Sequence, residues 1–245
     1  MNTEITNYDA RLEYYFGRDR FVTAGVFYKD IDAPIVEYIL PEGETLSTSF
    51  INAPSATLFG FEFEFEQTFE MANLFDDFWA DSELFVKANY TYTSSEMSAG
   101  DNDTVVVAVP QAGNPLASIE GASGYIEDGQ ALQGQSEHLA NLQIGIEDDT
   151  SRTAVLFNYT GERTRALANV ARGLPAVVEE PPFTVDLVHS RTFELENGGF
   201  YDVRFAVRNL LGDDYVATQS SGGTSLVVDQ YDIGTTFSVS LKRTF

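Results

Sequence analysis

The chain has 245 residues, a length that fits one or two ordinary domains. Asp and Glu number 38 against 14 Lys and Arg, so the formal net charge is −24, which argues against binding to a nucleic-acid backbone. With no cysteine and only two histidines, the sequence excludes disulfides, thiolate zinc sites and a histidine-cluster metal site, and no cofactor is expected.

Apolar and polar residues alternate along most of the chain. Successive residues of a β-strand point to opposite faces of a sheet, so this alternation predicts strands. The clearest segment, residues 61–66, reads Phe-Glu-Phe-Glu-Phe-Glu and separates three Phe from three Glu. The alternation predicts nine long strands, over residues 3–16, 20–31, 57–69, 83–94, 135–147, 152–161, 183–193, 199–210 and 231–245.

The connections between these strands also alternate in length. Short connections occur at 17–19, 148–151 and 194–198, with a somewhat longer one at 70–82. Long loops follow every second strand, which places all of them at one end of an up-and-down sheet. The four long loops hold all eight prolines and span 32–56, 95–134, 162–182 and 211–230.

A sheet with one apolar face must bury that face against another layer or in lipid. Lipid is favoured by the strand length, since a tilted transmembrane strand needs about 9–11 residues. Short turns at one end and long loops at the other are also typical of outer-membrane barrels. The sequence therefore predicts an all-β fold, an antiparallel up-and-down transmembrane barrel.

Nine is an odd number of strands, and an odd meander closes only with a parallel pair. Either residues 35–40 form a tenth strand or the chain is part of a larger barrel. The first five residues, Met-Asn-Thr-Glu-Ile, carry no signal peptide, which favours the second interpretation.

The C-terminal third resembles the TonB-dependent outer-membrane receptors. Residues 200–215, Phe-Tyr-Asp-Val-Arg-Phe-Ala-Val-Arg-Asn-Leu-Leu-Gly-Asp-Asp-Tyr, resemble the penultimate strand and following turn of that family. Residues 231–245 resemble its final strand, which ends in an aromatic residue, and residues 7–16 look like an internal strand. The turn motif consists of Asn209, Leu210, Asp213 and Tyr215, and the barrel-assembly signal of Phe237, Val239, Leu241 and Phe245.

This resemblance implies that residues 1–245 are the C-terminal part of a 22-stranded barrel in the outer membrane of a Gram-negative bacterium. It implies TonB-energised uptake of a scarce ligand of the siderophore, cobalamin or carbohydrate class. The plug domain and the contact with TonB are expected upstream of Met1, so the fragment alone is expected to be inactive. The expected partners are membrane lipid, the barrel-insertion machinery and an unidentified small molecule. No motif of an enzyme is found, and none is expected.

The candidate site residues fall into two groups. The first lies in the long loops, where aromatic or charged side chains are candidates for ligand contact: Tyr38, Phe50, Tyr125, Arg163, Arg165 and Arg172. The second would line the barrel lumen as a wet wall: Glu62, Glu64, Glu66, Lys87, Arg204 and Arg208. The two arginines of the second group are expected to pair with Asp186 or Asp202, or with the plug.

Two alternatives remain from the sequence alone. A soluble, secreted β-sandwich that acts as a binding module would use the net charge for solubility and the loops as a binding edge. A complete small outer-membrane barrel of eight to ten strands would need an even strand count and an upstream signal peptide.

Overall fold

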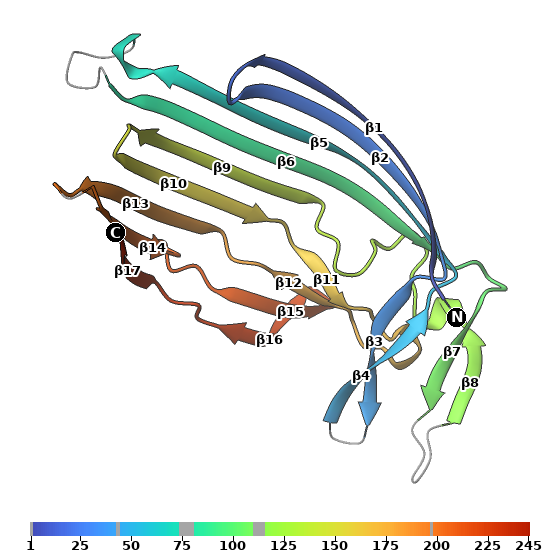
Figure 1. Cartoon of the computed structure of the whole chain (residues 1–245). Helices are drawn as coiled ribbons and strands as arrows, with labels where there is room; N and C mark the ends of the chain where they lie inside the picture. The colour runs from blue at the N-terminus through green and yellow to red at the C-terminus, as the bar shows by residue number, and fades with distance from the viewer. Residues whose placement is uncertain (1, 43–44, 74–80, 110–115, 197) are drawn as a thin grey trace.

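The main element of the protein is one antiparallel sheet of nine strands, which forms a long, curved and open wall (Figure 1). The computed structural model describes residues 2–42, 45–73, 81–109, 116–196 and 198–245. Neighbours in the sheet follow chain order: β1 (Glu4–Gly17), β2 (Arg20–Asp32), β5 (Ser55–Glu70), β6 (Glu83–Ser98), β9 (His138–Glu147), β10 (Ser151–Thr160), β13 (Thr184–Glu194), β14 (Phe200–Arg208) and β17 (Thr236–Thr244).

All nine predicted strands are confirmed, and the largest difference lies at the start of the last one. We expected that strand from residue 231, but Tyr231 ends a separate strand and β17 begins at Thr236. The interruption has a local cause, because Gly234 adopts a left-handed conformation with φ of 66°. A left-handed residue breaks the extended run, and only glycine adopts it without strain.

The strand register keeps one face of the sheet apolar from the first strand to the last. One cross-strand row runs from Leu12 through Ala24, Phe63, Tyr90 and Ala140 to Tyr159. A second row continues the same face from Val155 through Leu187 and Val207 to Phe237. Side chains of this apolar face are widely exposed, Leu12 at 75% and Val239 at 73%, so the face has the character of a surface that meets lipid.

The opposite face is polar in the same register. Its clearest row runs from Thr23 through Glu64, Asn89, Asn141 and Asn158 to Thr184. Across it the Asn141 amide donates a hydrogen bond of 2.8 Å to the Asn89 amide oxygen. In the part of the chain that the structure describes, no second sheet covers the apolar face, as a β-sandwich would require.

The two outer strands of the sheet, β1 and β17, run in the same direction, from the long-loop end to the short-turn end. The N-terminus lies at the long-loop end and the C-terminus at the short-turn end, next to opposite edge strands of the sheet (Figure 1). Closure between these edges would need a parallel pair, and β1 pairs only with β2 among the described residues. The wall is therefore part of a barrel rather than a closed one.

The long connections contain strands, whereas the sequence predicted loops there, apart from a possible strand at residues 35–40. Residues 32–56 form the hairpin β3 (Ile35–Glu42) and β4 (Thr45–Asn52), so the segment considered as a tenth wall strand pairs outside the wall. Residues 95–134 contain the hairpin β7 (Thr104–Val109) and β8 (Leu116–Gly121). The two remaining loops together form a four-stranded sheet of β11 (Arg163–Ala166), β12 (Val177–Glu180), β15 (Tyr215–Ser221) and β16 (Thr224–Tyr231).

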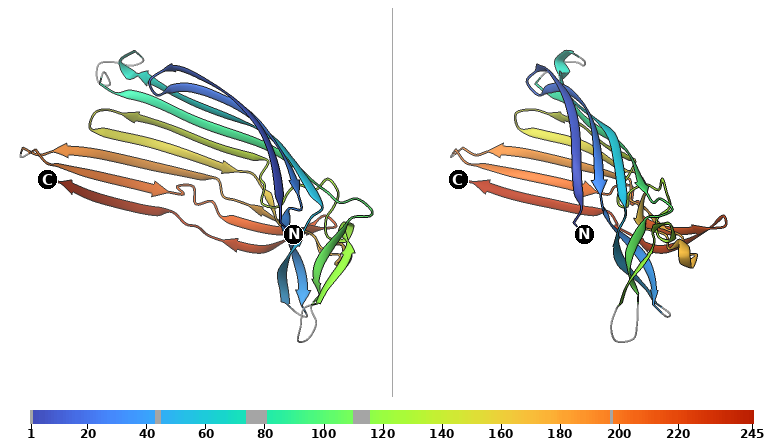
Figure 2. Two further views of the ribbon diagram at one scale, coloured as in Figure 1. Left: turned by 45° about the vertical axis from the view of Figure 1, so that its right-hand side comes forward. Right: turned by 90° about the vertical axis from the view of Figure 1, so that its right-hand side faces the viewer.

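All these loop strands lie at one end of the wall, as predicted (Figure 2). Two views of the molecule place the β3–β4 and β7–β8 hairpins beyond the same ends of β2, β5 and β6. The polar face of the wall becomes apolar at this end, where Ile31, Ala56 and Met97 form one cross-strand row. The hairpins pack on that row and form the loop core, whose main buried members are Val36, Tyr38, Ile51, Tyr125, Ile126 and Leu167.

Candidate functional site at the long-loop end

The polar face of the wall carries the predicted acidic stripe. Glu62, Glu64 and Glu66 alternate with apolar residues along β5 and point to this face. Glu66 forms an ion pair with Lys87 on β6, and a carboxylate oxygen of Glu64 lies 3.3 Å from Arg11 on β1. Lys87 thus supplies a partial counter-charge, and the hydrated lumen wall stays a prediction.

Arg204 and Arg208 lie on the same face of β14, and both are exposed. Among the described residues, neither forms an ion pair. Asp202 instead accepts a hydrogen bond of 2.8 Å from the Thr192 hydroxyl, and Asp186 accepts one of 2.9 Å from the backbone N–H of Asn209. The expected pairing of these arginines with Asp186 or Asp202 is therefore not formed.

Tyr38 and Tyr125, predicted as ligand contacts, lie in the loop core. Tyr38 is fully buried and Tyr125 is 7% exposed, and their rings meet edge to face with centroids 5.2 Å apart. The Tyr125 hydroxyl donates a hydrogen bond to Glu120, and burial, followed by this bond, raises the pKa of Tyr125. Because both side chains are buried, their placement does not support the predicted contact with a ligand. The sequence alone does not show which face of a loop hairpin packs inward.

Arg163 and Arg165 lie in the four-stranded loop sheet and are held by acidic partners. Arg163 pairs with Glu179 at 2.5 Å, and Arg165 pairs with Asp229 at 2.8 Å. The Tyr215 hydroxyl joins the two pairs, since it donates to Glu179 at 2.5 Å and accepts from Arg165 at 3.3 Å. The five side chains come from four different strands and fasten the loop sheet together.

This network shifts the pKa values of Tyr215, Glu179 and Arg165. Burial, and then the hydrogen bond to Glu179, raise the pKa of Tyr215 to about 12. Burial alone would raise the pKa of Glu179, but hydrogen bonds from Tyr215 and Arg163 outweigh it and the net shift is downward. Bonding to Asp229 raises the pKa of Arg165. Tyr215 therefore stays protonated, and Glu179 stays ionised, across the neutral range.

Phe50 and Arg172 are the two loop candidates that the structure leaves open to solvent. Phe50 is 65% exposed on β4, on the side of the hairpin opposite the loop core. Arg172 is exposed in the short 3₁₀ helix Val170–Arg172. A role in ligand contact stays a prediction for both.

The predicted turn motif after β14 is a tightly bonded corner. Asn209 adopts a left-handed φ of 51°, and its amide donates to the carbonyls of Asp213 at 3.1 Å and Gly234 at 3.3 Å. Asp213 accepts a hydrogen bond of 2.8 Å from the backbone N–H of Phe183. Tyr215, which joins the two ion pairs of the loop sheet, is the first residue of β15. Leu210 is half exposed. Asn209 thus joins β13, β14 and β17 at the long-loop end.

The predicted assembly signal lies along the outer edge strand. Phe237, Val239 and Leu241 all project from the apolar face of β17, and Phe245 follows the strand at 92% exposure. The guanidinium carbon of Arg243 lies 4.3 Å from the centroid of the Phe245 ring. These side chains form a continuous exposed strip at the edge of the wall.

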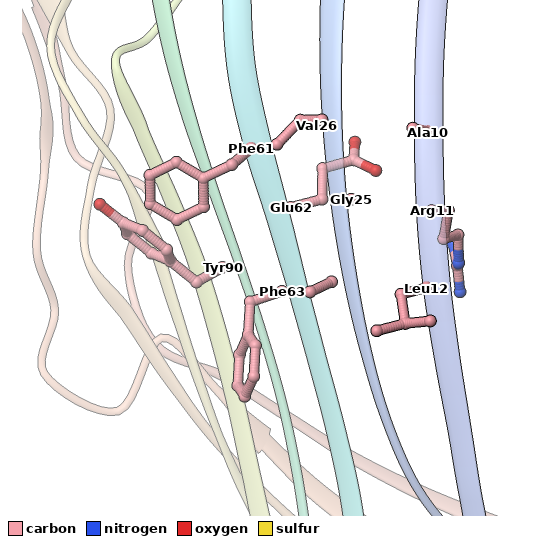
Figure 3. A pocket seen from close by; sticks show the side chains of 10 residues that line it. Ala10, Arg11, Leu12, Gly25, Val26, Phe61, Glu62, Phe63 and Tyr90 are labelled. Carbon is pink, nitrogen blue, oxygen red and sulfur yellow. The ribbon is translucent and has the colours of Figure 1, made fainter.

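Two recesses differ sharply in character. The first, of 530 Å³, is a hollow in the apolar face, lined by Ala10, Leu12, Val26, Phe61, Phe63 and Tyr90 (Figure 3). The second, here called the mouth recess, has a volume of 410 Å³ and lies between the β3–β4 hairpin and the loop sheet. Its polar lining comprises Glu37, Thr48, Arg165, Gln219 and Asp229.

Of this polar lining, only Arg165 is among the candidate residues predicted from the sequence. The other four side chains come from β3, β4, β15 and β16, and no motif links them. The described residues include no cluster of three or more His, Asp or Glu suited to a metal ion. No helix formed by those residues is long and apolar enough to cross a membrane.

A family model described as TonB dependent receptor-like, beta-barrel matches residues 3–210. The chain belongs to this family. The match covers β1 to β14 and ends at Leu210, inside the turn motif. No curated protein and no solved structure matches the chain.

Membership in the TonB-dependent receptor barrel family bears on what surrounds the apolar and polar faces of the sheet. The family consists of outer-membrane transporters of Gram-negative bacteria, not of enzymes. In barrels of this family the apolar outer face meets lipid, and the placement of Glu62 and Arg204 in the lumen stays a prediction. The loop core covers the polar face at the long-loop end, and the mouth recess lies at that same end.

Proposed function

We propose that the chain forms the C-terminal wall of a receptor for TonB-energised uptake of a scarce small molecule. The observation that carries this proposal is the contrast between the two ends of the wall. One end has short turns, whereas the other has hairpins that fold over the lumen-facing side. A receptor that captures a ligand outside the cell needs structured loops at one opening only.

The proposal includes location and partners. Residues 1–245 supply the last nine strands of a 22-stranded barrel in the outer membrane of a Gram-negative bacterium. Lipid contacts the apolar face, and the barrel-insertion machinery binds the final strand. Contact with TonB belongs to a region outside this chain, so the chain alone transports nothing. The ligand belongs to the siderophore, cobalamin or carbohydrate class.

The experiment is membrane fractionation with a matched pair of variants in β9. Leu142 faces lipid and its neighbour Asn141 faces the lumen, so Leu142→Arg and Asn141→Arg place the same charge on opposite sides. An arginine on the lipid side near the bilayer centre costs about 2–4 kcal/mol. We expect the protein with its natural sequence and Asn141→Arg in the outer-membrane fraction, resistant to alkaline extraction, and much less Leu142→Arg there.

A monomeric protein in the soluble fraction that unfolds cooperatively without detergent would contradict the proposal and support a β-sandwich. Uptake is then measured in cells that make the complete receptor, with and without TonB. Uptake that persists without TonB would contradict the energised mechanism but not the location.

A further inference from the structure

The mouth recess has the form of a preorganised binding site. Its two walls come from distant parts of the chain, yet Gln133 joins them directly. The Gln133 amide oxygen accepts a bond of 2.6 Å from the Glu37 backbone N–H, and its amide nitrogen donates to the Arg165 carbonyl. The backbone N–H of Leu167 adds a bond of 3.0 Å to the Glu37 carbonyl. The walls are thereby held in place without a ligand, which lowers the entropy lost on binding.

The recess also rests on a well-packed base. Glu37 lies next to Tyr38 on β3, and Tyr38 points into the loop core on the other side of the hairpin. The buried Asn169 amide donates a bond of 3.0 Å to the carbonyl of Ile39, the next residue that lines the recess. The volume of 410 Å³ falls within the range of about 300–1,000 Å³ usual for small-molecule sites.

The charges in the recess exclude an anionic ligand. Arg165 is neutralised by Asp229 at 2.8 Å. Among the described residues, Glu37 forms no ion pair, so its carboxylate leaves the recess with one uncompensated negative charge. An anionic group would meet this charge with no free cation among the described lining side chains to compensate for it.

The remaining chemistry matches hydroxyl groups. A hydroxyl both donates and accepts, and the recess offers carboxylates that accept, at Glu37 and Asp229, beside the Thr48 hydroxyl and the Arg165 guanidinium, which donate. Ile39 and Val177 provide an apolar patch for carbon-bound hydrogens. We propose that the mouth recess binds a neutral sugar unit of the ligand. This inference narrows the ligand class of the proposed function to carbohydrate.

The test is direct binding to the full chain in detergent micelles, measured by saturation-transfer NMR and calorimetry. The probes are maltose and cellobiose as neutral sugars, gluconate as an anion and spermidine as a cation. Glu37→Gln removes the free charge, and Glu180→Gln makes the same change on an exposed residue of β12 outside the mouth recess. Electrophoretic mobility before and after heating verifies that each variant is folded.

We expect one or both neutral sugars to bind, with gluconate excluded. A hydrogen bond to a charged group contributes enough that Glu37→Gln should weaken sugar binding about tenfold or more, whereas Glu180→Gln should leave it unchanged. Thr48→Val, which keeps the side-chain shape, should also weaken it. Failure of both sugars to bind, equal binding by Glu37→Gln, or preference for gluconate or spermidine would each overturn the proposal.

These outcomes are separable from those of the proposed function. A protein that enters the outer membrane and supports TonB-dependent uptake, but binds no neutral sugar at this recess, overturns the sugar inference alone. A protein that never enters the membrane overturns the proposed function, whatever it binds.

Discussion

Phe27 lies directly across from Gly60 on the neighbouring strand, and its ring occupies the space that a side chain at Gly60 would need. A Cβ atom at position 60 would lie 2.3 Å from Phe27 Cζ and 2.3 Å from the carbonyl oxygen of Tyr92. Phe85 and Gly145 repeat the arrangement, with a distance of 2.4 Å from such a Cβ to Phe85 Cζ. An aromatic ring laid over a cross-strand glycine packs on bare backbone and stabilises a strongly curved sheet.

Gly60→Ala is therefore expected to destabilise the wall. One methyl group there forces both the ring and a ladder carbonyl to move, at about 1–3 kcal/mol. The matched control is Gly25→Ala in β2, where the nearest atom to a new Cβ is 3.6 Å away. Urea unfolding of refolded protein in detergent measures both, and equal midpoints for the two variants would contradict this account.

Leu167→Ala should loosen the long-loop end without affecting the wall. Leu167 is fully buried in the loop core, and truncation of a buried leucine costs about 2–5 kcal/mol. Leu226→Ala is the control, since Leu226 is 66% exposed on β16. Limited proteolysis should cut the loops of Leu167→Ala much faster than those of Leu226→Ala. Slow, equal cleavage would mean that the loop core does not hold the hairpins.

Tyr215→Phe should alter the pH range in which the loop sheet is stable. The pKa of Glu179 is lowered on folding, so its contribution is present above its ordinary value of 4.5 and is lost as pH falls through the lowered pKa. The pKa of Tyr215 is raised from 10.0 to about 12, so its contribution is present below 10.0 and is lost as pH rises through about 12.

The phenylalanine variant removes the bond that lowers the pKa of Glu179, so the acid limit of loop stability should move to higher pH. It also removes the Tyr215 hydroxyl, so loss of stability at high pH should no longer depend on this group. Tyr231→Phe is the control. Tyr231 stacks on Tyr215 with ring centroids 4.6 Å apart, and this variant removes a hydroxyl but preserves the stacked ring. The measurement is protease sensitivity across pH. The same pH dependence in both variants would contradict the prediction.

Asn209→Ala should be more harmful than Asn209→Gly. Both variants lose the two amide bonds to Asp213 and Gly234, which contribute about 1 kcal/mol each. Alanine adds the strain of φ at 51°, about 1 kcal/mol, which glycine avoids. In thermal unfolding in detergent, the natural protein should have the highest unfolding temperature, Asn209→Gly a lower one and Asn209→Ala the lowest. The reverse order of the two variants would rule out backbone strain.

Phe245→Ala should separate assembly in cells from stability in vitro. Phe245 is 92% exposed and its ring lies beside Arg243, so its loss should change the unfolding midpoint little. If it is part of the assembly signal, the amount of protein in the outer membrane should fall several-fold. Phe193→Ala serves as the control, since Phe193 is an exposed aromatic near the same end of the wall. Equal membrane levels for the two variants would contradict a special role of Phe245.

The sequence by itself determined the wall. Side chains alternate between the two faces in any strand, so the local pattern from Phe61 to Glu66 assigned each residue to a face of the sheet. The same alternation along the chain predicted the nine strands. Alternation of short and long connections then fixed which end carries the loops. The turn from Asn209 to Tyr215 was recognisable through its resemblance to a family motif, whereas the left-handed conformation of Asn209 was not predicted.

Only the tertiary structure decided the arrangement of the loops. Tyr38 and Phe50 looked alike as candidates, yet Tyr38 is buried and Phe50 is exposed, because packing between hairpins far apart in sequence selects the face. The contacts of Arg165 with Asp229 and of Gln133 with Glu37 span 64 and 96 residues. Contacts of such long range follow from how the whole chain packs, and no local pattern encodes them.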